Sequence, residues 1–109
     1  MKIIQNDELL FSDVRLADSF SLRFLGLMPR KELKPSEGLL LTDCSRIHTN
    51  FMHFTIDVVY LSENLRILDV ETVRPWRLGK WVKGARHVLE VAENGACRMR
   101  RGEPITVKE

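Results

Sequence analysis

The chain has 109 residues, of which 44% are hydrophobic and 29% charged, and its formal net charge at pH 7 is +2. This composition is ordinary for a folded domain and argues against a disordered chain, and no apolar run approaches the ~20 residues that a membrane span needs. We therefore expect one domain over residues 1–109, with no membrane partner and no overall field that would require an acidic partner.

The N-terminal segment predicts no secretory signal peptide. Asn6, Asp7 and Glu8 interrupt its apolar residues, whereas a signal peptide needs a continuous apolar region. We therefore expect a cytoplasmic protein. Its cysteines, Cys44 and Cys97, are then expected to stay as thiols, because disulfides are rare in a reducing compartment.

The N-terminal third predicts short strands and one helix. Residues 2–17 are expected to form two strands with a turn at Asn6-Asp7, because apolar and charged side chains alternate toward the end of this segment. Residues 19–28 are expected to form a helix capped by Ser19. Its apolar side chains recur with helical spacing and are predicted to pack into the core: Phe20, Phe24 and Leu27.

From Gly38 onward the sequence is typical of β-structure, with a hairpin turn at Ser62-Glu63-Asn64 and an irregular segment at 74–85. The segments with the composition of strands are 39–41, 47–54, 56–61, 65–73, 87–91 and 105–107. Many short strands and one helix predict a mainly β (α+β) fold, a small single-domain β-barrel or sandwich with one short helix.

Side chains able to carry chemistry gather in one apolar segment, namely Cys44, His48, His53 and Asp57. Polar groups are costly to bury there unless they are paired. Residues four apart on a strand lie about 13 Å from each other, and the odd separation of the two histidines points them to opposite faces. We therefore predict neither a metal site nor a cofactor. We interpret Cys44 as a structural thiol rather than as a nucleophile paired with His48 or His87.

Several short motifs follow one another along residues 14–107. They are Arg23 with Gly26-Leu27-Met28, Gly38 to Leu41, Ile47-His48-Thr49, Phe51-Met52, Ile56-Asp57-Val58-Val59, Pro75-Trp76-Arg77, Val88-Leu89-Glu90 and Gly95. In order and spacing the chain resembles an uncharacterised prokaryotic family, domain of unknown function 192. The resemblance implies a small β-barrel with one helix and supplies no substrate. Thr55 stands where many members have proline, and Glu103 where aspartate is usual, which argues against a catalytic aspartate at that turn.

We predict a ligand site at the mouth of this domain, where small barrels commonly bind with a few convergent polar groups. The side chains expected to line it are His48, Met52, Asp57, Trp76, Arg23 and Glu90. Asp57 and Glu90 are each either such a site carboxylate or a structural partner of cations and backbone N–H groups. The favoured function is binding of a small anionic or sugar-like molecule or a peptide. The first alternative is an enzyme that uses Asp57 or His48 as acid or base.

The stretch RPWRLGKWVKGAR places a cation at every third position, with two tryptophans between. This basic face consists of Arg74, Arg77, Lys80, Lys83 and Arg86. The preferred interpretation is a solvated loop anchored to the domain by its tryptophans. We predict that Trp76 is buried and make no prediction between burial and exposure for Trp81. Binding of single-stranded nucleic acid through this stretch is a further, less favoured alternative. We expect a monomer.

Overall fold

The computed structural model describes residues 1–109 apart from the side chain of Phe20, so the predicted packing of that ring lies outside the described part. Within the described chain, eight strands form two sheets, with one short α-helix, α1 (Phe20–Leu25), and a 3₁₀ helix, η1 (Gly95–Arg98). The strands are β1 (Lys2–Gln5), β2 (Glu8–Phe11), β3 (Asp13–Ala17), β4 (Glu37–Leu41), β5 (Ile56–Leu61), β6 (Ile67–Val73), β7 (His87–Ala92) and β8 (Thr106–Lys108). The predicted mainly β fold with one short helix is confirmed.

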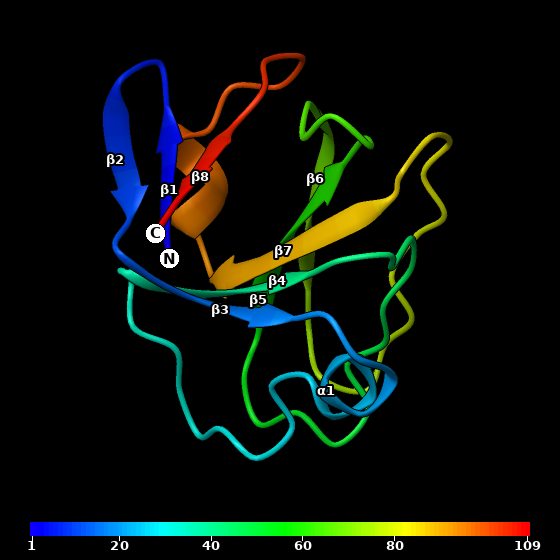
Figure 1. Ribbon diagram of the computed structural model, residues 1–109. Coiled ribbons are helices and arrows are strands. Elements are labelled where there is room, and N and C mark those ends of the chain that lie inside the picture. Colours follow the sequence, from blue (N-terminus) through cyan, green and yellow to red (C-terminus); the bar gives the residue numbers. More distant parts are fainter.

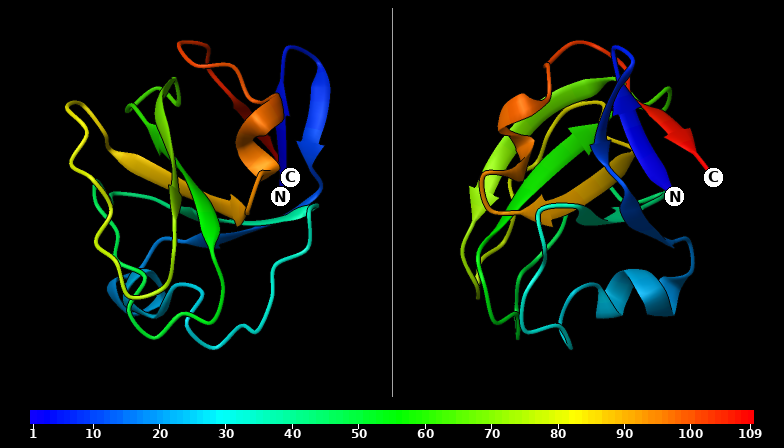
Figure 2. Two further views of the ribbon diagram at one scale, coloured as in Figure 1. Left: turned by 180° about the vertical axis from the view of Figure 1, so that it is seen from behind. Right: turned by 90° about the vertical axis from the view of Figure 1, so that its left-hand side faces the viewer.

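The two sheets do not close into one barrel, and the architecture is that of a sandwich. One sheet has the order β2-β1-β8 and the other the order β3-β4-β7-β5-β6. β3 is parallel to β4, whereas β4, β5, β6 and β7 pair antiparallel. The three-stranded sheet and α1 lie at opposite ends of the molecule (Figures 1 and 2). The termini lie side by side, because β1 pairs with β8.

Two predicted strand segments differ from the structure. Residues 2–17 form three strands rather than two, because Ser12 separates β2 from β3. Residues 47–54 form no extended strand, and their strand-like pairing is limited to an isolated bridge between His48 and Leu78. A left-handed residue, Phe51 (φ 66°), breaks this segment into turns. The result is a loop that carries several of the predicted site residues at one edge of the large sheet.

The apolar core is divided between the two faces of the large sheet. Alternation along a strand sends successive side chains to opposite faces. In β7, Val88 belongs to one buried cluster and Leu89 to the other. The cluster with Leu89 also contains Ile3, Phe11 and other residues of the small sheet, whereas the cluster with Val88 contains Leu27, Ile47 and Met52 beside α1. The cluster that contains Val88, next to α1, adjoins the candidate site described below.

The helix is shorter and more peripheral than predicted. Ser19 caps it as expected, since its Oγ accepts a hydrogen bond from the Leu22 N–H at 3.2 Å. It ends after six residues because Gly26 adopts φ 51° and ψ −128°, a conformation that only glycine takes readily. The prediction that Phe24 packs into the core is wrong, since that residue is 61% exposed, whereas Leu27 is buried as expected.

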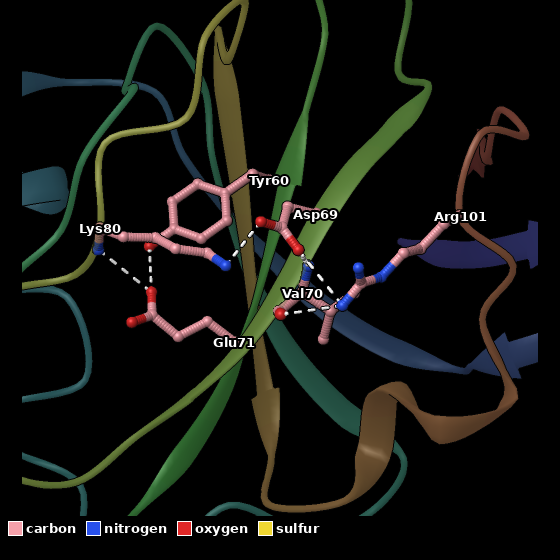
Figure 3. Close-up of polar contacts among 6 residues, drawn as sticks. All are labelled: Tyr60, Asp69, Val70, Glu71, Lys80 and Arg101. Carbon is pink, nitrogen blue, oxygen red and sulfur yellow. Dashed lines mark hydrogen bonds and ion pairs between the residues drawn. The ribbon is translucent and has the colours of Figure 1, made fainter.

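A polar network holds the irregular segment 74–85 against the large sheet (Figure 3). Tyr60 donates its hydroxyl to Glu71 Oε2 at 2.7 Å, and the same oxygen accepts the Lys80 backbone N–H at 3.1 Å. Lys80 Nζ lies 2.6 Å from Asp69 Oδ2, and Arg101 lies 3.2 Å from Asp69 Oδ1. Burial and Glu71 together raise the pKa of the Tyr60 hydroxyl, so it stays a donor. This network fixes the position from which the basic stretch projects.

Candidate functional site

A cavity of about 60 Å³ lies between the C-terminal end of α1, the loop after β4 and the face of β7. It brings together four of the six residues predicted to line a ligand site: Arg23, His48, Met52 and Glu90. Most of the remaining wall is formed by Cys44, Arg46 and the segment 24–28, which runs from the last turn of α1 into the following turn. The volume exceeds the ~10–15 Å³ that one water requires, so a small polar head group fits.

Glu90 is the chemically unusual residue of this cavity. Strand alternation directs it to the face beside α1, and its register partners in the neighbouring strands are Leu39 in β4 and Val58 in β5. It is 3% exposed, and its Oε1 accepts no hydrogen bond from any described group. Burial raises the pKa of this carboxyl to about 8. Glu90 is therefore largely protonated at neutral pH, and it lines the cavity with a buried carboxyl oxygen that has no partner among the described groups.

Two guanidinium groups border the same cavity. Arg23 extends from α1 and donates from Nη1 to the Thr42 carbonyl at 3.2 Å. Arg46 donates from Nε to the Gly79 carbonyl at 2.8 Å. Arg23 is half-buried and Arg46 exposed. A guanidinium has five N–H donors in a planar fork, so each group retains the capacity to bind an anion at the edge of the cavity.

Cys44 and His48 both line the cavity, but they do not form the thiolate–imidazole pair of a nucleophilic site. The Cys44 thiol donates to the Arg46 carbonyl at 3.3 Å. Burial, with a smaller contribution from Glu90, raises its pKa. His48 Nδ1 accepts the Asn50 N–H at 3.3 Å, and His87 Nδ1 accepts the Asp43 N–H at 3.1 Å. The interpretation of Cys44 as a structural thiol fits these contacts.

An apolar groove of about 410 Å³ adjoins the cavity and shares Leu25, Met28 and Met52 with it. Pro29, Phe51, His53 and Trp76 complete the groove. The rings of Phe51 and Trp76 lie 4.6 Å apart between centroids. The prediction that Trp76 is buried is wrong, because it is 56% exposed. Sequence reasoning did not single out Phe51, Leu25 or Met28 as site residues. The adjacent pair Phe51-Met52 was the available signal.

Thr49 holds the aromatic part of the groove in place. It is fully buried, and its Oγ1 donates to the Arg74 carbonyl at 2.6 Å and accepts the Arg77 N–H at 2.8 Å. Its carbonyl accepts the Trp76 N–H at 3.0 Å. These bonds fix Trp76 at φ 63°, which bulky residues rarely adopt. Sequence reasoning missed this role because the partners are far from Thr49 along the chain.

Asp57 lies on the opposite face of the large sheet from Glu90. Its register partner in β7 is Val91, which belongs to the core cluster beside the small sheet. Its carboxylate accepts a hydrogen bond from Thr72 Oγ1 at 2.9 Å and another from the Ala96 N–H at 3.2 Å. The contacts of Asp57 are those of a structural acid that joins β5 to β6 and η1.

All five cations of the basic face are exposed, as is Trp81 at 67%. Two of them form ion pairs: Lys80 with Asp69, and Arg86 with Asp43 at 3.8 Å. Among described side chains, Arg74, Arg77 and Lys83 form no ion pair.

Among the residues that the structure describes, no three His, Cys, Asp or Glu side chains lie close enough together to hold a metal ion. No helix of the described residues is long and apolar enough to cross a bilayer.

Comparison with known proteins places the chain in a family. Residues 1–106 match the family DUF192, described as an uncharacterized ACR. The chain belongs to the DUF192 family. A UPF0127 protein of Pyrococcus horikoshii is 40% identical over 81 residues, which is 72% of this chain and 70% of the relative. A UPF0127 protein of Pyrococcus furiosus is 35% identical over 81 residues, with the same shares of the two chains.

The fold of this DUF192 protein also occurs among solved structures. A crystal structure of a protein of unknown function from Novosphingobium aromaticivorans superposes with a TM-score of 0.82 at 18% sequence identity, covering 97% of this chain and 82% of the other. At this identity the likeness shows the fold alone. The family and its structural neighbour therefore establish the architecture of the chain, and no specific function comes with them.

Proposed function

We propose that this protein binds a small amphipathic organic molecule, with a polar head group in the Glu90 cavity and an apolar body in the adjoining groove. The observation that carries this proposal is that Glu90 lines the cavity and that its Oε1, a buried polar atom, lacks a hydrogen-bond partner among described groups. A buried polar group without a partner costs about 1–3 kcal/mol. A ligand that supplies the missing partner recovers part of that cost on binding.

The groove supplies the surface for the apolar part of such a ligand. Ligand pockets combine apolar walls with a few placed polar groups, and the cavity and groove have this division between them. Phe51 and Trp76 both hold left-handed backbone conformations, at φ 66° and 63°. Such strain persists only where surrounding contacts enforce it, and it is concentrated at functional sites.

The test uses Trp76 as a reporter. The chain has two tryptophans, so Trp81→Phe leaves Trp76 as the single indole, and its emission should shift when an apolar molecule enters the groove. Leu25→Lys should weaken the response at least about tenfold, because it places a charge in the groove. The matched control is Leu22→Lys, since Leu22 and Leu25 lie on α1 and are both 47% exposed, but Leu22 is not part of the groove. Equal loss in both variants, or no shift with any amphipathic probe, would contradict the proposal.

Acid–base chemistry at this site would depend on Glu90 rather than on Asp57 or His48. Glu90 lines the cavity and has a raised pKa, at about 8. Such a pKa suits a carboxyl that carries a proton at neutral pH. Of the neighbouring groups, the Cys44 thiol donates to the Arg46 carbonyl and His48 Nδ1 accepts the Asn50 N–H, so neither atom is free to act together with Glu90. Binding is therefore the function that we propose.

A second candidate function is binding of single-stranded nucleic acid. It is favoured by the exposure of both tryptophans, at 56% and 67%, beside exposed Arg74, Arg77 and Lys83. Exposed aromatic rings among cations suit stacked bases and phosphates. Replacing these three cations together with Gln should abolish oligonucleotide binding measured by fluorescence anisotropy, and binding should weaken steeply with salt. Lys80 stays unchanged in this design, because it is paired with Asp69. No binding at low salt would remove this candidate.

A further inference from the structure

The polar groups of the Glu90 cavity differ in kind between its interior and its edge. In the interior, Glu90 presents a carboxyl oxygen without a protein partner among the described groups, and the residue is 3% exposed. At the edge, Arg23 and Arg46 present guanidinium groups that each use one N–H for a backbone carbonyl. Guanidinium forks match carboxylates in geometry. The site therefore offers an acid inside and two cations at its edge.

Head groups with a single charge use only part of this arrangement. An amine would pair with Glu90 but would lie near two guanidinium groups without supplying an anion for them. A carboxylate would pair with Arg23 but would leave Glu90 Oε1 as it is in the structure. A buried charge is tolerated only where it is paired and hydrogen-bonded. A head group with an ammonium and a carboxylate on neighbouring atoms satisfies both ends of the cavity.

We propose that the ligand is a free apolar α-amino acid, whose ammonium binds Glu90, whose carboxylate binds Arg23, and whose side chain lies in the groove against Met52 and Trp76. This inference rests on the proposed function, because it names the head group and body of the amphipathic ligand. The groove walls are hydrocarbon, thioether and aromatic, so they favour side chains such as those of phenylalanine or leucine over polar ones.

Binding of the ammonium is coupled to release of a proton. Without bound ligand, Glu90 is largely protonated at neutral pH, because its pKa is about 8. A bound ammonium favours the carboxylate, so the proton leaves as the ligand enters. The other ionisable groups on the cavity are Arg23 from α1 and Cys44, Arg46 and His48 from the loop after β4, while the register neighbours of Glu90 in β4 and β5 are apolar. Calorimetry at pH 7 in buffers of different ionisation enthalpy should therefore report release of roughly one proton.

The proposal is tested by isothermal titration calorimetry with four probes: L-phenylalanine, 2-phenylethylamine, 3-phenylpropionate and glycine. L-Phenylalanine should bind at least about tenfold more tightly than the amine or the acid, because each of these lacks one charge pair. Glycine should bind more weakly still, because it lacks the apolar body. Equal binding of 3-phenylpropionate would overturn the assignment of an ammonium to Glu90, and equal binding of 2-phenylethylamine would overturn the role of Arg23.

Two variants test whether L-phenylalanine binding depends on Glu90. Glu90→Gln preserves shape but cannot become a carboxylate, so it should lose at least about tenfold in L-phenylalanine affinity and lose the proton release. The matched control, Glu93→Gln, alters an exposed acid three positions further on and should change neither. Circular dichroism and thermal unfolding establish that each variant is folded. Unchanged L-phenylalanine binding in Glu90→Gln overturns the inference.

The result also separates the inference from the function on which it rests. If the Trp76 emission responds to an apolar probe such as anilinonaphthalene sulfonate but no amino acid binds, the amphipathic site stands and the amino-acid inference fails. If no probe elicits a response in the Trp81→Phe protein, both fail together. If L-phenylalanine binds without a Trp76 response, the head-group assignment stands and the placement of its side chain in the groove fails.

Discussion

Asp57 and Glu90 are two buried acids on paired strands, 4% and 3% exposed, that face opposite sides of one sheet. Asp57 accepts hydrogen bonds from Thr72 Oγ1 and the Ala96 N–H. Glu90 lines a cavity, and its Oε1 has no partner among the described groups. Equal burial therefore has different consequences, since the first acid joins elements of the fold and the second costs stability, which the ligand that we propose would recover in part. The partners of a buried acid, more than its burial, distinguish a structural role from a binding role.

The largest expected difference between the two acids is the change in unfolding free energy when each one is replaced. Asp57→Ala should destabilise the protein by about 3 kcal/mol, because it leaves the buried Ala96 N–H and the Thr72 hydroxyl without their acceptor. Urea unfolding measures the change. A loss below about 1 kcal/mol would mean that Asp57 is not a structural partner of η1 and β6, and the contrast with Glu90 would fail.

Glu90→Leu should act in the opposite direction. Leucine replaces the carboxyl with hydrocarbon between Leu39 and Val58, the register neighbours in β4 and β5. We expect stability at pH 7 to rise by about 2 kcal/mol, since removal of a buried ionisable group without a partner is commonly stabilising. The same urea experiment applies. Destabilisation comparable with that of Asp57→Ala would show that Glu90 is paired in solution.

The pH dependence of stability should also identify Glu90. Its folded pKa, about 8, is raised above the ordinary value of 4.5, so the folded protein keeps a proton that the unfolded chain loses. This contribution is fully present below pH 4.5 and is lost as the pH rises toward 8. Unfolding free energy should fall by about 1 kcal/mol per pH unit across that window, and Glu90→Leu should flatten the slope. An unchanged slope in the variant would assign it to other groups.

The smallest expected effect concerns the outer wall of the Glu90 cavity. Phe24 borders it and contacts His48, with ring centroids 6.3 Å apart, but is 61% exposed. Phe24→Ala should therefore cost only about 0.5 kcal/mol in thermal or urea unfolding, as surface substitutions do. A loss of about 3–5 kcal/mol, as expected for a buried phenylalanine, would place the ring in the core.

The sequence predicted the strands that carry these acids better than the acids' roles. Apart from Asp57, the run Ile56–Leu61 is apolar on both faces, and the predicted strand coincides with β5. Glu90 lies between the apolar residues Leu89 and Val91, and this pattern predicts the strand that the structure shows as β7. The roles depend on partners that local patterns do not reveal: Thr72 and Ala96 are 15 and 39 residues from Asp57.

The errors at Phe24 and Trp76 have different origins. The apolar spacing at 19–28 predicts a continuous helix, but the backbone of Gly26 ends the helix after Leu25. Trp76 was expected to anchor its loop, whereas Thr49 performs that role with hydrogen bonds from 25 and more positions away. Of the six predicted site residues, the four that share the cavity came from three separate segments: α1, the loop after β4, and β7. Only the tertiary fold brings them together.

The titration of the Glu90 side-chain carboxyl tests the central claim most directly. The carboxyl carbon of Glu90, followed by NMR from pH 4 to pH 10 in protein without added ligand and assigned with Glu90→Gln, reports the protonation of this group alone. A buried acid without a protein partner should titrate with a midpoint of about 8. A midpoint near 4.5, the ordinary value, would mean that Glu90 is solvated or paired in solution and would contradict the proposed ligand site.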